Sequence, residues 1–330
     1  MRLIDKHVLP VVLVSIFSLA ACGGSDDDDD GGGGPDPVAC DLASATDYPS
    51  VVNSLDLPTS VAEASSLALD LDGDNNNDNK LGELLATLGS TFGIDLQTTV
   101  GAALNAGEVI ILTNLRAEDL TRGCGSFGVF LGANPDPEPC NADGVCGLHL
   151  SGSASFELDA QSPTDTVVNG TIVGGRFALG EDDEPGRFEL ELDLIEGEDP
   201  IRVELIGAQV ELSSISDSGV VGILGGAVTE ETINNDILPP LAGAVNTLYQ
   251  ADCALNGDVC ECAAGSTGAT LKTLLDPNGD CVITAEEVQT SGTIQALIQP
   301  DLDLVGDDGE EESLSLGVSF STVGATFTAP

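Results

Sequence analysis

Oxygen-bearing side chains recur at a regular spacing in residues 276–287, which read DPNGDCVITAEE. Positions 1, 3, 5, 9 and 12 of this segment carry a carboxylate, amide or hydroxyl group, and the main-chain carbonyl at position 7 can add another oxygen. The positions are Asp276, Asn278, Asp280, Val282, Thr284 and Glu287. Calcium takes six to eight oxygen ligands, and a loop with this spacing can wrap them around one ion. The sequence therefore predicts a Ca²⁺ site here.

This segment, the 276 loop, resembles the EF-hand calcium loop, with Glu287 as the bidentate ligand that closes it. Residues 269–275 and 285–288 have helical patterns on either side. Cys281 stands at position 6, where EF-hand loops carry glycine for a sharp turn. A non-glycine residue in a left-handed conformation costs ~1–2 kcal/mol, and a disulfide through Cys281 would hold it there. The alternative is a polar turn before a capped helix.

A second acidic segment, residues 70–78, reads DLDGDNNND and is called the 70 loop. It resembles the D-x-D-x-D-G-x-x-D loops of several extracellular calcium proteins. The resemblance implies Asp70, Asp72, Asp74 and Asp78 as ligands. Asn75 replaces the glycine, which is a mild change because Asn tolerates positive φ. A solvated polar turn is the alternative.

The register of the 70 loop is open in the sequence. Counting from Asp70 leaves no glutamate at position 12, whereas counting from Asp72 places Glu83 there and Asn79 in the slot that is usually apolar. A third acidic segment begins with Asp301 and Asp303 and continues through residues 307–310. We interpret that segment as an ordinary loop.

The elements that position these loops are mainly strands. Polar and apolar residues alternate in several segments, and the 188–194 segment, FELELDL, pairs a solvated face with a packed one. The strand segments are residues 148–158, 167–179, 187–195, 201–212, 220–228 and 313–327, with buried strands at 108–115 and 126–131. Helical patterns cover residues 81–88, 98–106 and 230–250, the last interrupted near Pro239 and Pro240. Residues 51–69 fit a strand or a helix.

These patterns predict a β-rich α+β fold with an antiparallel sheet, as a sandwich or an open barrel, and short helices. We expect an N-terminal α/β part at residues 38–146, which carries the 70 loop. A β-rich part follows at residues 147–330 and carries a cysteine cluster and the 276 loop. The two parts are either separate or a single domain.

The chain has nine cysteines. Apart from Cys22, eight remain, an even number that favours disulfides in an exported protein. The candidates are Cys40, Cys124, Cys140, Cys146, Cys253, Cys260, Cys262 and Cys281. We predict a local Cys140–Cys146 bond and a last group of four that closes on itself, which leaves Cys40 with Cys124. A zinc site at Cys260 and Cys262 is less favoured, because no histidine is near.

The segment at residues 19–22, Leu-Ala-Ala-Cys, follows a basic start and a short apolar run. It resembles the lipobox of bacterial lipoproteins, which implies that residues 1–21 are a signal peptide and that Cys22 is lipidated. Residues 22–37 are rich in Gly and Asp and predict a disordered tether. A glycine after Cys22 favours the outer membrane over the inner one. The expected location is therefore the cell envelope, with the membrane as partner through the lipid anchor.

The balance of charge is strongly acidic: 56 Asp and Glu face nine Lys and Arg, for a net charge of −47. Nucleic-acid binding is excluded, because phosphate recognition needs clusters of basic residues. Cations are attracted instead. At 42% hydrophobic content the chain can form a true core.

Four segments carry a broader resemblance, namely LDLDGDNNNDNKLGELL, GILGGAVTEETIN, GDVCECAAGSTGATL and SLSLGVSF. They are similar to EF-hand-like lipoproteins common in myxobacterial-type genomes. The resemblance implies an envelope location and metal binding, and it implies no activity.

Catalytic motifs are sparse. His149 lies in an alternating apolar segment, where a structural role is the more common one, and no G-x-S-x-G or Walker motif occurs. We therefore predict a non-enzymatic, calcium-binding lipoprotein with a structural or adhesive role. The alternatives are a carrier that holds an apolar ligand in a β-cup, and an envelope hydrolase.

Overall fold

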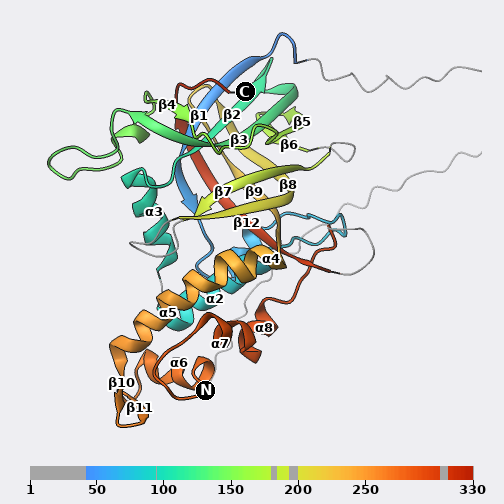
Figure 1. Cartoon of the computed structure of the whole chain (residues 1–330). Coiled ribbons are helices and arrows are strands. Elements are labelled where there is room, and N and C mark those ends of the chain that lie inside the picture. The colour runs from blue at the N-terminus through green and yellow to red at the C-terminus, as the bar shows by residue number, and fades with distance from the viewer. Residues whose placement is uncertain (1–41, 94, 180–183, 193–199, 305–310, 330) are drawn as a thin grey trace, which may run out of the picture. The chain divides into compact units, whose positions relative to one another are not determined.

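Eight antiparallel strands close into a barrel in the computed structural model (Figure 1). In barrel order they are β2 (Ile111–Ala117), β1 (Thr46–Asp56), β12 (Ser313–Gly324), β9 (Gly219–Thr229), β8 (Ile201–Ser216), β6 (Arg176–Ala178), β5 (Val167–Val173) and β3 (Arg122–Asp136). Pairing of β2 with β3 completes the ring. The predicted β-rich antiparallel fold is confirmed, and the barrel is closed rather than open.

The structure describes residues 42–93, 95–179, 184–192, 200–304 and 311–329. The expected signal peptide, the tether, the lipidation site Cys22 and the disulfide candidate Cys40 lie outside these ranges. Residues 307–310 of the third acidic segment also lie outside them. The two parts predicted at residues 38–146 and 147–330 share the barrel, because β1, β2 and β3 come from the first and the other five strands from the second.

The barrel has one weak seam. The long strand β8 pairs with β6 through Phe177 and Leu212 only. Along its first half it pairs instead with β7 (Gly186–Leu192). A further short strand, β4 (Ser155–Leu158), extends from β3. Side chains must therefore help to join the β7–β8 hairpin to β3.

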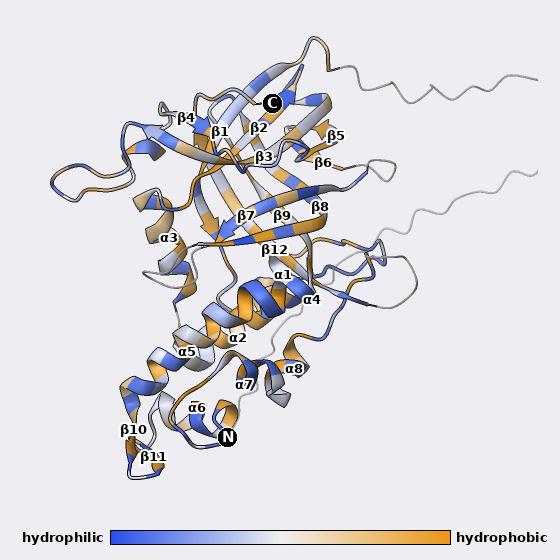
Figure 2. Cartoon of the chain, viewed as in Figure 1, coloured by the Kyte–Doolittle hydropathy of each residue, from blue (hydrophilic) through white to orange (hydrophobic). Residues whose placement is uncertain are grey.

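Alternation along the strands fills the barrel with apolar side chains. On β7, Phe188, Leu190 and Leu192 are buried while the residues between them are only partly covered. The same alternation is visible along β7 and β8 in Figure 2. Burial of each such side chain contributes about 1.5–3 kcal/mol, so the period-two pattern selects the face that points inward.

Helices α2 and α5 lie across one end of the barrel, and α3 lies beside it (Figure 1). Leucines 81, 84, 85 and 88 of α2 join the same core cluster as the barrel interior. The helices are α1 (Val61–Ser66), α2 (Lys80–Phe92), α3 (Leu96–Ala106), α4 (Glu230–Thr232), α5 (Leu238–Asp252), α6 (Thr267–Leu275), α7 (Ala285–Thr290) and α8 (Gly292–Leu297). A two-stranded hairpin, β10 (Cys253–Asn256) and β11 (Val259–Cys262), follows α5.

The helical segment predicted at residues 230–250 continues through its prolines. A π-helical turn, η2 (Ile233–Ile237), joins α4 to α5 directly before Pro239 and Pro240. Proline has no N–H to donate to the preceding turn, so the helix widens there instead of ending.

Three predicted segments differ from the structure. Residues 167–179, predicted as one strand, form the paired strands β5 and β6 around a turn at Gly174 and Gly175, which both have positive φ. Residues 51–69 contain both predicted forms, the end of β1 and then α1. Residues 148–158 are a strand only at β4, because η1 (Leu148–Leu150) forms a single 3-10 turn that buries His149. The apolar residues in this segment cover the outside of the barrel, where Phe156 packs with Phe130 and Leu112.

Candidate functional site

The 276 loop joins α6 to α7, as its predicted flanks require. Ser266 caps α6 by accepting a hydrogen bond from the Ala269 N–H. Thr284 and Glu287 form a reciprocal capping box at the start of α7. These caps satisfy main-chain donors that a helix start leaves free, and so they fix where the loop ends.

Asp276 is the buried centre of this loop, with 4% of its surface exposed. Its Oδ1 accepts the Gly279 N–H at 2.7 Å and the Asp280 N–H at 3.2 Å. Its Oδ2 accepts the Cys281 N–H at 3.2 Å and the Tyr249 hydroxyl at 2.5 Å. A carboxylate buried to this extent needs such donors, because desolvation penalises its charge.

The remaining predicted ligands of the 276 loop lie around Asp276. Asn278 Nδ2 donates to Glu287 Oε1 at 2.8 Å, which links positions 3 and 12 across the loop. Glu287 Oε2 accepts from the Thr284 N–H and hydroxyl at 3.0 and 2.9 Å. Asp280 Oδ1 accepts the Val282 N–H at 2.9 Å. The structure thus gathers the residues of the predicted ligand set along one loop.

The 70 loop lies between α1 and α2. Its carboxylates are closer together: one oxygen each from Asp70, Asp72 and Asp78 lies within 4.8 Å of the others. The fourth predicted ligand, Asp74, is not part of this group; its carboxylate accepts from the side chain of Asn76 at 2.7 Å. Within the described residues, the 276 loop has no equally tight group of three carboxylates.

The two loops share one hydrogen-bond pattern. In each, the carboxylate at position 1 accepts the main-chain N–H groups of positions 4 and 6, at 2.8 and 3.0 Å for Asp70 and at 2.7 and 3.2 Å for Asp276. The position 3 side chain accepts the N–H of position 5, at 3.0 Å in the 70 loop and 2.9 Å in the 276 loop. The position 5 side chain accepts the N–H of position 7, at 2.7 and 2.9 Å.

Backbone conformation matches as well. Positions 4 and 6 have positive φ in both loops, 80° and 70° at Gly73 and Asn75, and 73° and 65° at Gly279 and Cys281. The pattern places Asp70, not Asp72, at position 1. Position 12 is then Leu81, a core residue that is 1% exposed. The alternative register through Glu83 does not match this pattern.

Apolar residues and amide contacts fix the 70 loop against the outside of the barrel. Leu69 and Leu71 pack in a small core with Ala227 of β9 and Leu302. Gln209 of β8 donates to the main-chain carbonyls of residues 70 and 71. Leu69 also forms a bridge with Asp78, which closes the loop at its base.

Asp78 carries the most perturbed carboxyl of the loops. Its pKa is raised to about 6, chiefly by burial; the Leu71 N–H bond at 3.2 Å opposes the shift, and the nearby carboxylates of Asp72, Asp301 and Asp74 contribute to it. Asp301, from the third acidic segment, has a pKa raised mainly by burial and accepts two hydrogen bonds from Ser315. No carboxylate of the 70 or 276 loop forms an ion pair within the described residues.

Three disulfides join described residues: Cys140–Cys146, Cys253–Cys262 and Cys260–Cys281. The predicted local pair and the predicted closure of the last four cysteines are confirmed. Cys124 is disulfide-bonded as well, and its pairing with Cys40 stays a prediction. The Cys260–Cys281 bond ties position 6 of the 276 loop to β11.

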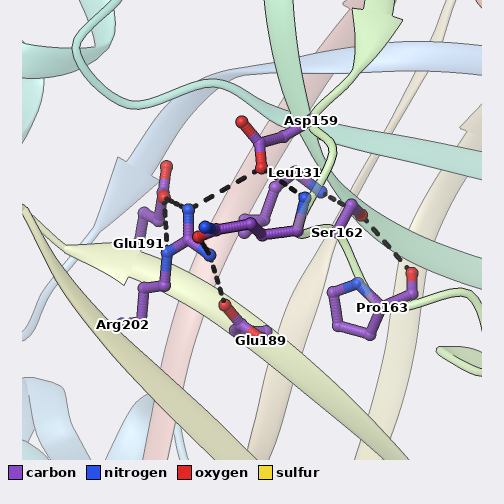
Figure 3. Close-up of polar contacts among 8 residues, drawn as sticks. Leu131, Asp159, Ser162, Pro163, Glu189, Glu191 and Arg202 are labelled. Carbon is purple, nitrogen blue, oxygen red and sulfur yellow. Dashed lines mark hydrogen bonds and ion pairs between the residues drawn. The ribbon is translucent and has the colours of Figure 1, made fainter.

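An arginine cluster at the barrel seam was not anticipated from the sequence (Figure 3). Arg202 on β8 lies 2.9 Å from Glu191 and 3.5 Å from Glu189, both on β7, and 3.8 Å from Asp159 beyond β4. It also donates to Gln161 at 2.7 Å. Burial raises the pKa of both glutamates, and Arg202 opposes that shift. The signal that could have found the cluster is the hairpin register, which sets Glu191 opposite Arg202.

The cluster joins the β7–β8 hairpin to the segment that follows β3. Asp159 donates its N–H to Leu131 on β3, and the Leu131 N–H bonds the Ser162 hydroxyl at 2.9 Å. Arg202 therefore spans the seam where β7 forms no strand pairing with β3 in the described part of the chain. This arrangement serves barrel closure.

His149, the one histidine in the described ranges, is fully buried and packs edge-on against Phe156. Neither ring nitrogen has a hydrogen-bond partner of ordinary geometry among the described residues. Burial lowers its pKa, and the nearby Leu104 main chain offsets this only in part. A substrate could not reach such a ring, so the structure gives the hydrolase alternative no support from His149.

One small cavity lies inside the barrel. The cavity between Val52, Val129 and Leu190 has about 10 Å³, which is room for one water at most. Ligand pockets of carriers need ~300 Å³ or more. A groove of about 340 Å³ lies outside the barrel, and its Asn114 and Arg116 side chains face Asp47. The carrier alternative stays a prediction.

Within the described ranges, helices that combine the length and apolar character needed to cross a bilayer are absent. Comparison with known proteins gave no match among family models, curated proteins or solved structures.

Proposed function

We propose that this protein is a calcium-binding lipoprotein of the cell envelope with a structural or adhesive role. The observation that carries the proposal is the convergence of the Asp70, Asp72 and Asp78 carboxylates within 4.8 Å. Three carboxylates this close repel one another unless a cation or a proton is shared among them. No basic side chain pairs with these carboxylates in the described part of the chain, so a bound cation would neutralise their repulsion.

Ligand chemistry favours calcium over other ions. Both loops offer only oxygen atoms, which suit hard cations such as Ca²⁺ and Mg²⁺ rather than zinc or copper. Mg²⁺ requires a near-ideal octahedron and gives up its water reluctantly, whereas Ca²⁺ accepts irregular shells. Loops without a full EF-hand ligand set suffice outside the cell, where calcium modules work with dissociation constants of ~10⁻⁴–10⁻³ M.

The 276 loop supports the proposal independently. It repeats the hydrogen-bond pattern of the 70 loop although the first seven residues of the two loops differ at positions 2, 3, 6 and 7. The contact between Asn278 and Glu287 holds the position 12 carboxylate over the loop. We propose Asp276, Asn278, Asp280, Val282, Thr284 and Glu287 as ligands, with Glu287 as the bidentate one.

The envelope location rests on Cys22 and on the signal-like segment before it. Stable anchoring takes more than one acyl chain, which the lipoprotein modification supplies. The acidic surface disfavours contact with anionic headgroups, so the proposed attachment to the membrane depends on the lipid anchor. We propose the outer membrane as the more favoured of the two membranes.

Calcium binding is tested by thermal unfolding and calorimetry of the full mature chain. At 10 mM Ca²⁺ and a dissociation constant of ~10⁻⁴–10⁻³ M, each site adds about 1.4–2.7 kcal/mol to the free energy of unfolding. The expected result is a melting temperature several degrees higher in calcium than in EGTA, and two binding events by calorimetry. Equal melting temperatures and a flat titration would refute the proposal.

Matched variants separate the loops. Asp72→Asn removes one carboxylate of the 70 loop, and Asp276→Asn removes the central one of the 276 loop; each should remove or strongly weaken one of the two binding events. Asp217→Asn, in the β8–β9 turn, changes the same charge outside both loops and should leave both events unchanged. The anchor is tested separately by labelled palmitate, which should mark the wild type and not Cys22→Ser.

A further inference from the structure

The 276 loop differs from the 70 loop in how position 6 is held. Asn75 holds its positive φ in the 70 loop without a covalent bond, whereas Cys281 has φ 65° and is bonded to Cys260 of β11. Side chains other than Gly, Asn and Asp rarely adopt this conformation. The disulfide therefore holds position 6 of the 276 loop in the conformation that asparagine adopts unaided in the 70 loop.

Both cysteines of this disulfide lie beside the hydrogen-bond donors that hold the Asp276 carboxylate. The Cys281 N–H donates to Asp276 Oδ2, and the Tyr249 hydroxyl donates to the same oxygen. The Tyr249 hydroxyl also lies 3.0 Å from the Cys260 sulfur. Tyr249 is fully buried, so it cannot follow the loop if the loop moves. The bond thus holds together the donors that orient the first proposed ligand.

A chemical path leads to this buried bond. Cys260 and Cys281 are 1% and 7% exposed, but Cys262 is half-buried and thus more accessible. The sulfurs of Cys253, Cys260 and Cys262 lie within 4.8 Å of one another. Thiol–disulfide exchange needs a thiolate close to a disulfide sulfur. The Cys253–Cys262 bond is therefore a point of entry to the Cys260–Cys281 bond.

The exchange balances with one external dithiol. A thiolate of the dithiol attacks the Cys262 sulfur, and Cys253 leaves as a thiolate. Cys253 then attacks the Cys260 sulfur, forms a Cys253–Cys260 bond and releases Cys281 as a thiolate, which takes a proton. The second thiol of the reductant attacks its own mixed disulfide, so Cys262 leaves as a thiol and the reductant becomes a cyclic disulfide. Two electrons and two protons have passed to the protein, and Cys281 is free.

We infer that the Cys260–Cys281 disulfide controls the calcium affinity of the 276 loop, so that reduction releases calcium from this loop and not from the 70 loop. This inference rests on the proposed function of both loops. Once Cys281 is free, calcium binding itself must impose the left-handed turn and re-form the donors around Asp276. We expect the calcium affinity of the 276 loop to fall about tenfold, which corresponds to the ~1–2 kcal/mol cost of that conformation.

The test is a calcium titration by calorimetry of the mature chain in Asp70→Asn/Asp72→Asn background, which isolates the 276 loop. Affinity is measured in the oxidised protein, after dithiothreitol treatment, and in Cys260→Ser/Cys281→Ser. The expected result is a dissociation constant about tenfold higher in the last two. Cys140→Ser/Cys146→Ser removes a disulfide from another part of the fold and should leave the constant unchanged.

Two further variants keep the outcome interpretable. Cys260→Ser/Cys281→Gly also lacks the disulfide but allows positive φ at position 6, and should recover most of the affinity. Cys260→Ser/Cys281→Ser in Asp276→Asn background reports on the 70 loop, whose unchanged affinity shows that the barrel is folded. Equal affinity of the 276 loop with and without its disulfide would overturn the inference while calcium binding stands. Absence of calcium binding in the oxidised protein would instead refute the proposed function, and the inference with it.

Discussion

Asn79 and Gly317 lie 238 residues apart in the chain and share a pair of hydrogen bonds: the Asn79 amide donates to the Gly317 carbonyl at 2.9 Å and accepts the Gly317 N–H at 2.9 Å. Asn79 also donates to the Ala64 carbonyl and accepts the Gly82 N–H at the start of α2. One buried side chain thus joins α1, α2 and β12 directly after the 70 loop. A methyl group on Gly82 would lie 2.2 Å from Asn79 Oδ1, so glycine is required there.

We expect Asn79→Ala to lower the free energy of unfolding by about 3 kcal/mol, because four main-chain groups lose a partner and the buried ones stay unsatisfied. Urea unfolding followed by circular dichroism measures the change. Asn77→Ala is the matched control, since Asn77 donates a single bond to the Ala68 carbonyl, and it should cost less than about 1 kcal/mol. Similar losses for the two variants would contradict this account of Asn79.

The register of the 70 loop gives a second prediction. With Asp70 at position 1, Asp78 lies at position 9 among the converging carboxylates, whereas Glu83 sits on α2 at 3.7 Å from Lys80. Asp78→Asn should weaken calcium binding to this loop about tenfold or more, because one charged ligand is lost. Glu83→Gln should leave it unchanged. Calorimetry in an Asp276→Asn background measures calcium binding to the 70 loop alone. If Glu83→Gln weakens binding as much as Asp78→Asn does, the register that counts from Asp72 is the correct one.

Arg202 provides a third prediction about the barrel seam. Replacing it by methionine leaves Glu189, Glu191 and Asp159 facing one another without their cation, which should cost about 2 kcal/mol. The exposed pair of Arg187 and Glu204, at 2.7 Å on the same hairpin, is the control. Arg187→Met should cost less than about 1 kcal/mol, since exposed pairs contribute little. Chemical unfolding at pH 7 measures the loss of unfolding free energy in both variants. Equal losses would contradict the role of Arg202 in barrel closure.

His149 gives a fourth prediction, on pH. Burial places its folded-state pKa below the unfolded value of ~6.5, so the unfolded state binds more protons in the window between the two values. Stability associated with His149 is therefore fully present above ~pH 6.5 and is lost as the pH falls through that value toward the folded pKa. The raised pKa values of Glu189 and Glu191 change the stability in the opposite direction. The effect of His149 is therefore measured as the difference between the wild type and a variant that lacks only this histidine.

His149→Phe removes the titrating ring and keeps an aromatic group beside Phe156. Unfolding free energies of wild type and variant should converge or cross as the pH falls from 7 to 5, with the wild type losing more. A constant difference between them across this range would show that His149 is not the titrating group.

Much of the fold was readable from local patterns. Alternation in residues 188–194 identified β7 and its buried face, because a strand that is solvated on one side needs polar and apolar residues in turn. The caps and apolar spacing around residues 276–287 identified a loop between two helices. The spacing of Cys140 and Cys146 predicted their disulfide, because two cysteines only six positions apart in an exported chain favour a local bond.

Other features depend on segments that meet only after folding. Whether the strands form a sandwich or a barrel depends on the β2–β3 pairing, which closes a ring that no local signal reports. Of the strand expected at residues 148–158, only β4 at residues 155–158 forms, and residues 148–150 form a 3-10 turn that buries His149. The Arg202 cluster combines β7, β8 and the segment after β4, and its members become neighbours only through strand register.

The sequence by itself determined the acidic loops, the even set of cysteines beyond Cys22 and the strands with one apolar face, because charge, spacing and period are properties of neighbouring residues. Only the tertiary structure decided that the barrel is closed and filled, that the 70 loop counts from Asp70, and that Cys281 is bonded to Cys260 beside Tyr249 and Asp276. The physical reason is that pairing and packing between distant segments depend on which buried surfaces fit together, and a linear sequence does not state that fit.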